Sequence, residues 1–105
     1  MVIVETSVFT RQVQKILADE EYRALQTALI ARPDTGKVIR GSGGIRKMRW
    51  SAKGRGKRGG VRVIYYWAVV REQLLMLFIY PKTKQSDLTR EQLKTLRRIV
   101  EGEYK

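Results

Sequence analysis

GGIRKMRW at 43–50, SAKGRGKRGG at 51–60 and VRVIYYW at 61–67 are the segments that decide the fold. Two apolar stretches with interleaved cations flank a loop of glycine and basic residues, which predicts a β-hairpin that presents positive charge. Residues 35–71 contain eleven Lys or Arg and no Asp or Glu. Because a solvated surface normally mixes both signs, this one-sided charge predicts a surface that binds phosphate groups.

The composition of the chain bounds its class. A chain of 105 residues forms one domain, 1–105. The net charge of +12 opposes compaction and is best tolerated beside an anionic partner, so we expect a nucleic acid, an acidic protein or both. The sequence has no cysteine and no histidine, which excludes disulfides and removes the commonest metal ligands and the commonest general base. We therefore expect no metal and no cofactor.

The N-terminus and the hydropathy pattern predict a cytoplasmic protein. Residues 1–5 lack the basic and long apolar regions of a signal peptide. The longest apolar run, at 63–70, is far shorter than a membrane span. We expect no membrane partner.

The N-terminal third of the chain predicts one strand and two helices. The β-branched run at 2–4 predicts a strand, and Thr6 or Ser7 is placed to cap the helix that follows. We expect Asp19 to cap a second helix, which a turn at 33–36 ends.

The remainder predicts four strands and a final helix. We expect an edge strand at 37–40, the two hairpin strands, of which the second runs over 61–70, and a last strand at 73–80. Thr89 and Gln92 form a capping box for the C-terminal helix. The predicted class is α+β with an antiparallel sheet, in the order β-α-α-β-β-β-β-α.

One residue breaks the alternation of the first hairpin strand. Lys47 and Arg49 fall on one face and Met48 on the other, because strand side chains alternate. Arg46 shares the parity of Met48, so we expect a β-bulge near Gly44 or a frayed start of the strand.

The cations of the expected sheet form the candidate site. If the two hairpin strands pair, three of these cations converge on one face, and two more follow the last strand. The alternative is an ordinary solvated face of a soluble sheet. The five residues are Lys47, Arg49, Arg62, Lys82 and Lys84.

Cutting RNA by attack of a ribose 2′-OH needs a proton acceptor, a proton donor and fixed cations around the transition state. Arginine stays protonated and can only stabilise charge. A lysine crowded by like charges has a lowered pKa, so we expect Lys47, Lys82 or Lys84 to carry protons. Tyr80 is a second possibility, although a half-buried tyrosine at a strand end is the simpler interpretation.

The glycine-rich run at 54–60 lacks the helix start and the Lys-Ser/Thr ending of a nucleotide-binding Walker motif. A basic hairpin tip that contacts the RNA backbone explains it better, with a plain exposed turn as the alternative. The residues expected to bind RNA there and at the strand start are Arg46, Lys53, Arg55, Lys57 and Arg58.

Three motifs resemble the HigB-type branch of the RelE toxin superfamily: G-x-GG-x-RK-x-RW at 41–50, G-x-GKRGG-x-RVIYY at 54–66 and YPK-x4-DLT at 80–89. The likeness extends over essentially the whole chain. It implies a RelE-like fold, in which the sheet packs against two N-terminal helices and a C-terminal helix. It also implies a ribosome-dependent endoribonuclease that cuts mRNA without a metal and inhibits translation.

The resemblance also implies roles for individual residues. In RelE-like toxins, the scissile phosphate is bound by basic residues on the strand before the hairpin, by an Arg that opens the following strand and by a basic residue after the last strand. These roles correspond here to Lys47 and Arg49, to Arg62, and to Lys82 with Lys84 as a second choice. Relatives add a Tyr or His near the C-terminus as acid or base. This chain has Leu88 or Thr89 there, so the identity of the proton carrier stays open.

The partners implied by the resemblance are a cognate antitoxin, the ribosome and mRNA. The antitoxin is often a helix-turn-helix protein of the HigA or Xre kind, and we expect it to have an acidic surface. The toxin is expected to contact operator DNA only through this antitoxin. Two alternatives explain the positive charge without catalysis: a non-catalytic RNA-binding protein and a toxin-like transcriptional co-repressor. A DNA-binding regulator is disfavoured, because the expected helices at 7–31 carry no basic recognition face.

Overall fold

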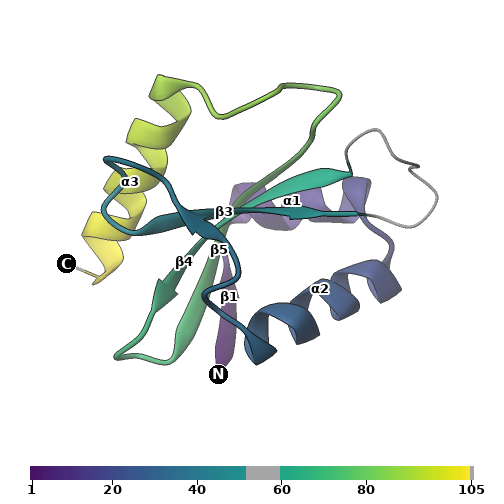
Figure 1. Cartoon of the computed structure of the whole chain (residues 1–105), viewed down its shortest axis with the longest axis horizontal. Coiled ribbons are helices and arrows are strands. Elements are labelled where there is room, and N and C mark those ends of the chain that lie inside the picture. The colour runs from purple at the N-terminus through teal and green to yellow at the C-terminus, as the bar shows by residue number, and fades with distance from the viewer. Residues whose placement is uncertain (52–59, 105) are drawn as a thin grey trace.

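A five-stranded sheet separates two layers of helices. The computed structural model describes residues 1–51 and 60–104. Along the chain its elements are β1 (Val2–Glu5), α1 (Ser7–Ile16), α2 (Asp19–Ala31), β2 (Lys37–Val38), β3 (Ile45–Trp50), β4 (Val61–Ala68), β5 (Gln73–Pro81) and α3 (Arg90–Tyr104). Helices α1 and α2 lie on one side of the sheet and α3 lies on the other (Figure 1). The α+β class and the order of elements are as predicted.

The sheet has the strand order β1-β5-β4-β3-β2. The pairs β2–β3, β3–β4 and β4–β5 are antiparallel, as expected, but β1 runs parallel to β5, so the sheet is mixed. The reason lies in the long connection between these two strands, which allows the parallel arrangement. Directly after β1, the Thr6 N–H donates to the Met76 carbonyl and the Thr6 hydroxyl donates to the Leu77 carbonyl, which fixes the start of α1 against β5.

Strand β4 is buried on both faces and divides the core into two layers. Its side chains alternate, so Val63 and Tyr65 pack against α1 and α2 while Ile64 packs on the α3 side. All three are fully buried. The predicted central strand is therefore confirmed, and it gives the candidate site a rigid base.

The two N-terminal helices begin in different ways. Thr6 caps α1 as predicted, since its hydroxyl accepts a hydrogen bond from the Phe9 N–H at 3.1 Å. The expectation for Asp19 is wrong: it is the first residue of α2, and Ala18 is the N-cap. The Ala18 N–H donates to the Glu21 carboxylate at 2.8 Å, which leaves Asp19 to contribute charge at the helix N-terminus.

The predicted capping box starts α3. The Thr89 N–H donates to the Gln92 side-chain oxygen at 3.0 Å, and the Gln92 N–H donates to the Thr89 hydroxyl at 3.0 Å. Leu88 and Leu93 both pack against the core on the α3 side. These contacts fix the end of the segment 82–89, which borders the candidate site.

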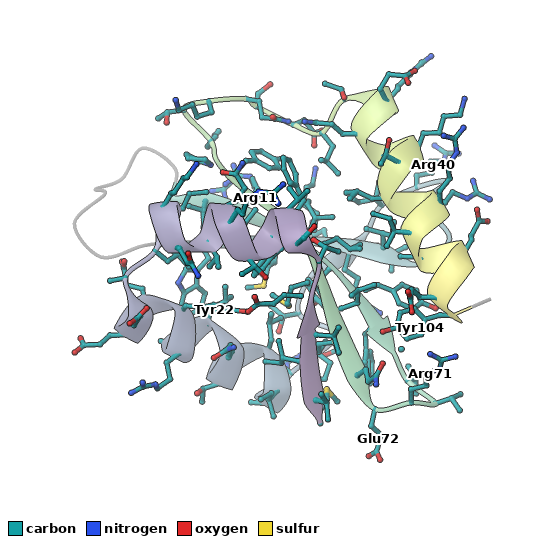
Figure 2. All side chains as sticks on the ribbon, turned by 180° about the vertical axis from the view of Figure 1, so that it is seen from behind. Arg11, Tyr22, Arg40, Arg71, Glu72 and Tyr104 are labelled. Carbon is teal, nitrogen blue, oxygen red and sulfur yellow. The ribbon has the colours of Figure 1, made fainter. Side chains whose placement is uncertain are left out.

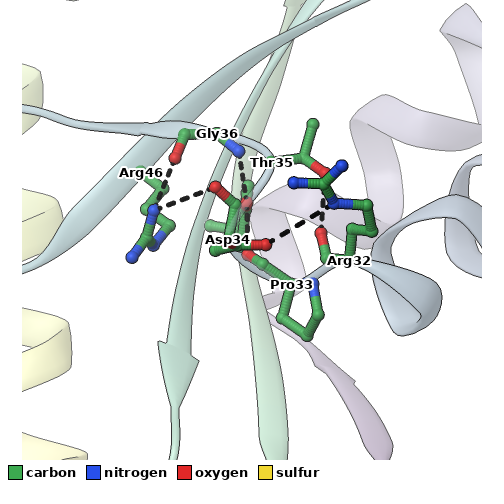
Figure 3. Close-up of polar contacts among 7 residues, drawn as sticks. Arg32, Pro33, Asp34, Thr35, Gly36 and Arg46 are labelled. Carbon is green, nitrogen blue, oxygen red and sulfur yellow. Dashed lines mark hydrogen bonds and ion pairs between the residues drawn. The ribbon is translucent and has the colours of Figure 1, made fainter.

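The β-bulge expected near Gly44 is wrong. Strand β3 pairs with β4 along its whole length without a break, and the irregular register lies instead between β4 and β5. The side chain of Arg46 lies on the same face of β3 as that of Met48, where its guanidinium has a structural role. Its Nη1 donates to the Gly36 carbonyl at 2.6 Å and to the Asp34 carbonyl at 3.2 Å, and so holds the turn after α2 (Figure 3).

Strand β4 ends at Ala68, two residues earlier than the apolar pattern predicts. Val69 and Val70 belong to the turn into β5, where Val70 is 97% exposed. The turn is closed by a hydrogen bond from the Glu72 N–H to the Val69 carbonyl, with Glu72 at φ 52°. Apolar identity alone therefore does not mark the end of this strand.

The turn after α2 is also anchored to the centre of the sheet through Tyr65. The Gly36 N–H donates to the Tyr65 hydroxyl at 2.8 Å, and that hydroxyl donates to the Pro33 carbonyl at 2.6 Å. Burial raises the pKa of Tyr65 above its ordinary value of 10.0. This anchor positions Thr35 and Lys37, which border the candidate site.

Tyr65→Phe removes both hydrogen bonds while keeping the ring. We expect the free energy of unfolding to fall by about 1–3 kcal/mol, because a buried N–H and a carbonyl lose their partner. Urea denaturation measures the change. Tyr104→Phe is the control, since Tyr104 ends α3 and its part-buried hydroxyl donates to the Gln73 side chain. Equal losses in the two variants would contradict the anchoring role of Tyr65.

Candidate functional site

The pairing of β3 with β4 brings three of the predicted cations together. Arg49 lies directly opposite Arg62, and Lys47 lies two residues along on the same face of β3. This is the face of the sheet that carries α3, because Ile45 and Ile64 on the same parity pack in the α3-side core. Like charges opposite one another repel, so this arrangement is suited to an anion placed between them.

A depression of about 310 Å³ lies at this cluster. It is open to solvent, and cations make up most of its lining. The residues that line it are Thr35, Lys37, Lys47, Met48, Arg49 and Arg62. Its size and its charge suit the phosphate groups of a polynucleotide.

The cations of the cluster differ in burial. Arg62 is only 7% exposed, whereas Arg49 is exposed. Lys47 is intermediate, with its side chain 36% exposed. A guanidinium held in the partly dry interior is screened less by solvent than one at the surface. Arg62 is therefore less screened by solvent than Arg49.

Asp87 brings a carboxylate to the cluster, and the sequence reasoning gave it no role. Its Oδ1 lies 3.0 Å from the Lys47 Nζ and also accepts the Leu88 N–H at 2.8 Å. The hydrogen bond from Lys47, followed by that from Leu88, lowers the pKa of Asp87 below its ordinary value of 3.8. Lys47 thus faces an opposite charge, and the premise that it is crowded by like charges alone is wrong. A sequence signal existed, because Asp87 is the one acidic residue between 73 and 90.

Tyr80 lies on the same face of the sheet as this cluster. It is directly opposite Arg62 on β5 and only 3% exposed, so it is more deeply buried than the half-buried residue that was expected. Burial, and then the charge of Asp87, raise its pKa above the ordinary value of 10.0, while Arg62 acts in the opposite direction. At neutral pH the phenol keeps its proton and can act as a hydrogen-bond donor.

Other predicted site residues are not brought into the depression. Lys82 and Lys84 are exposed on the segment 82–89, and the depression is lined without them. Arg46 binds the turn carbonyls described above, on the other parity of β3. The predicted RNA-binding residues Lys53, Arg55, Lys57 and Arg58 lie outside the described residues.

The described part of the chain offers neither a metal site nor a membrane-spanning helix. No three or more Asp, Glu, His or Cys side chains gather there in a way that could hold a metal ion. No helix within 1–51 and 60–104 combines the length and the apolar character needed to cross a membrane.

A family model described as the RelE toxin of the RelE/RelB toxin–antitoxin system matches residues 1–104. The chain belongs to the RelE toxin family. The fold of this RelE-family toxin is also similar to the solved structure of a mutant of the E. coli toxin RelE in the free state, with a TM-score of 0.60 and 11% sequence identity. The match covers 93% of this chain and 94% of that chain. Membership of the family makes the protein a toxin with an antitoxin partner.

The Lys47–Asp87 contact predicts the titration of Asp87 in this RelE-family toxin. Because the folded-state pKa is lowered, the contact stabilises the fold above the unfolded-state pKa, and this contribution is lost as pH falls through the folded-state pKa. Lys47→Met should raise the pKa of Asp87 toward 3.8, as measured by carbon NMR of the side-chain carboxyl. Lys37→Met is the matched control, since Lys37 lines the depression without bonding Asp87. An unchanged pKa in Lys47→Met would show that the contact does not exist in solution.

Proposed function

We propose that this toxin is a ribosome-dependent endoribonuclease that cuts mRNA and thereby inhibits translation. The observation that carries the proposal is the convergence of Lys47, Arg49 and Arg62 in one depression beside the carboxylate of Asp87. Cations alone support RNA binding. A carboxylate among them adds a group that can accept a proton.

The proposed reaction uses the RNA's own 2′-OH as nucleophile. The 2′-oxygen attacks the adjacent phosphorus, its proton passes to the Asp87 carboxylate, and the bond to the 5′-oxygen breaks. Arg49 and Arg62 neutralise the charge that builds up on the phosphate oxygens. The leaving 5′-oxygen takes a proton from Lys82 or Lys84 on the neighbouring segment. The products are a 2′,3′-cyclic phosphate and a 5′-hydroxyl.

The chemistry of Asp87 gives a reason for dependence on the ribosome. A carboxylate is a weak base at neutral pH, and the contact with Lys47 lowers the pKa of Asp87 further in the protein without RNA, so the isolated site is a poor nuclease. A ribosome that holds mRNA in the reactive geometry supplies orientation, which can be worth several orders of magnitude in effective concentration. We therefore expect slow cutting of free RNA.

We further propose that the toxin is of the HigB type and acts in the cytoplasm. The three motifs at 41–50, 54–66 and 80–89 support the subtype. The proposed partner is a helix-turn-helix antitoxin of the HigA or Xre kind, through which the toxin meets operator DNA. The net charge of +12 is complementary to an antitoxin with an acidic surface.

Arg62→Lys tests the nuclease proposal with little change in volume. Lysine keeps the charge but lacks the planar fork that binds a phosphate through two donors, so we expect cleavage in a purified translation system to fall on the order of a hundredfold. Mapped mRNA 5′ ends measure the rate. Arg23→Lys is the matched control, because Arg23 is exposed on α2, on the other side of the sheet.

Two further outcomes would count against the proposal. Rapid cutting of free RNA by the wild type would remove the dependence on the ribosome. A wild type that neither arrests growth nor cuts mRNA would point to an RNA-binding protein or a co-repressor.

A further inference from the structure

The hydroxyl of Tyr80 differs from those of three other tyrosines in the chain. It is buried, and within the described residues it has no hydrogen-bond partner. By contrast, the hydroxyls of Tyr22, Tyr65 and Tyr104 donate to the Glu5 side chain, the Pro33 carbonyl and the Gln73 side chain respectively. Buried polar groups nearly always have a partner, so a buried hydroxyl without one needs an explanation.

The position of Tyr80 suggests what that explanation is. Arg49, Arg62 and Tyr80 form a row across β3, β4 and β5, each directly opposite the next. Neighbouring strands lie about 4.8 Å apart, so the three side chains rise from adjacent positions on one face. Two cations and one neutral hydrogen-bond donor thus lie in a row across the three strands. Tyr80 is at the β5 end of this row, and the segment 82–89 comes directly after β5.

Asp87 links the row to the rest of the site. Its charge acts on both Tyr80 and Arg62, so the carboxylate lies near both groups while it is bound to Lys47. An RNA phosphate carries the same charge as Asp87 and competes with it for Lys47 and for Arg62. Entry of a phosphate therefore favours displacement of Asp87 from its present contact.

We propose that the Tyr80 hydroxyl donates a hydrogen bond to the phosphate of bound RNA, next to Arg49 and Arg62, once the phosphate has displaced Asp87 from Lys47 toward the RNA 2′-OH. The inference rests on the proposed action of this site on RNA. It assigns Tyr80 direct contact with the substrate, as a donor that keeps its proton. It also explains why the hydroxyl has no partner in the protein without RNA.

Tyr80→Phe is the decisive variant because it removes only the hydroxyl. We expect cleavage in the purified translation system to fall about tenfold or more, since a hydrogen bond to a charged group is lost. We expect the melting temperature to stay the same or rise, because the hydroxyl has no partner to lose in the free protein. A loss of activity accompanied by a loss of stability would overturn the inference in favour of a structural role.

Tyr104→Phe is the matched control. Figure 2 shows Tyr104 beside Arg71, near the turn from β4 to β5 and away from the segment 82–89. The Arg71 guanidinium lies 4.8 Å from the centre of the Tyr104 ring. This variant loses the hydrogen bond to Gln73, so we expect slightly lower stability and an unchanged cleavage rate.

A binding measurement separates this inference from the nuclease proposal. The probe is a short 2′-O-methyl RNA, which cannot be cut by 2′-OH attack. We expect it to shift the carbon NMR resonance of the Tyr80 ring carbon that bears the hydroxyl, and to bind Tyr80→Phe several-fold more weakly. These two results in a protein that cuts no mRNA would support the Tyr80 contact and reject the nuclease. A wild type that cuts mRNA, with no resonance shift and with equal rates and affinities for Tyr80→Phe, would overturn the Tyr80 contact alone.

Discussion

The burial of β4 on both faces is the constraint on which the candidate site depends. Apolar layers under α1 and α2 and under α3 fix this strand, and with it the register of its two neighbours. Arg62 is the second residue of β4, and only 7% of it is exposed to solvent. Opposed arginines destabilise a sheet, so the energy that holds Arg49 against Arg62 comes from the hydrophobic layers. The fold thus holds Arg49 and Arg62 opposite one another on two paired strands.

Local patterns in the sequence were sufficient for the order of the elements and for part of the candidate site. The alternation in 45–50 and the apolar run after the loop predict the hairpin, and the hairpin predicts that Lys47, Arg49 and Arg62 share a face. These features depend on neighbours in the chain or on one pairing. Their physical basis is the two-residue period of a strand.

Contacts between distant segments could not be predicted in this way. Arg46 looked like an irregularity because its partner, the Gly36 carbonyl, belongs to a turn ten residues away. Asp87 reaches Lys47 across forty residues of sequence. The parallel pairing of β1 likewise depends on the last strand of the sheet. Each of these contacts depends on how distant segments pack together in the folded protein. A short stretch of sequence carries no information about that packing.

The pairing of β1 with β5 also determines when the toxin can fold. β1 is the first strand to be synthesised, yet within the described sheet its one neighbour is β5, which is the last. Val2 therefore has no strand partner until Gln73 has been made, and the sheet is closed by a contact of very high sequence separation. Such contacts form slowly, because a long chain loses much entropy when its ends are joined. Tyr80 lies in β5 and Asp87 follows it, so the candidate site is completed only after β5 and the segment 82–89 have been synthesised.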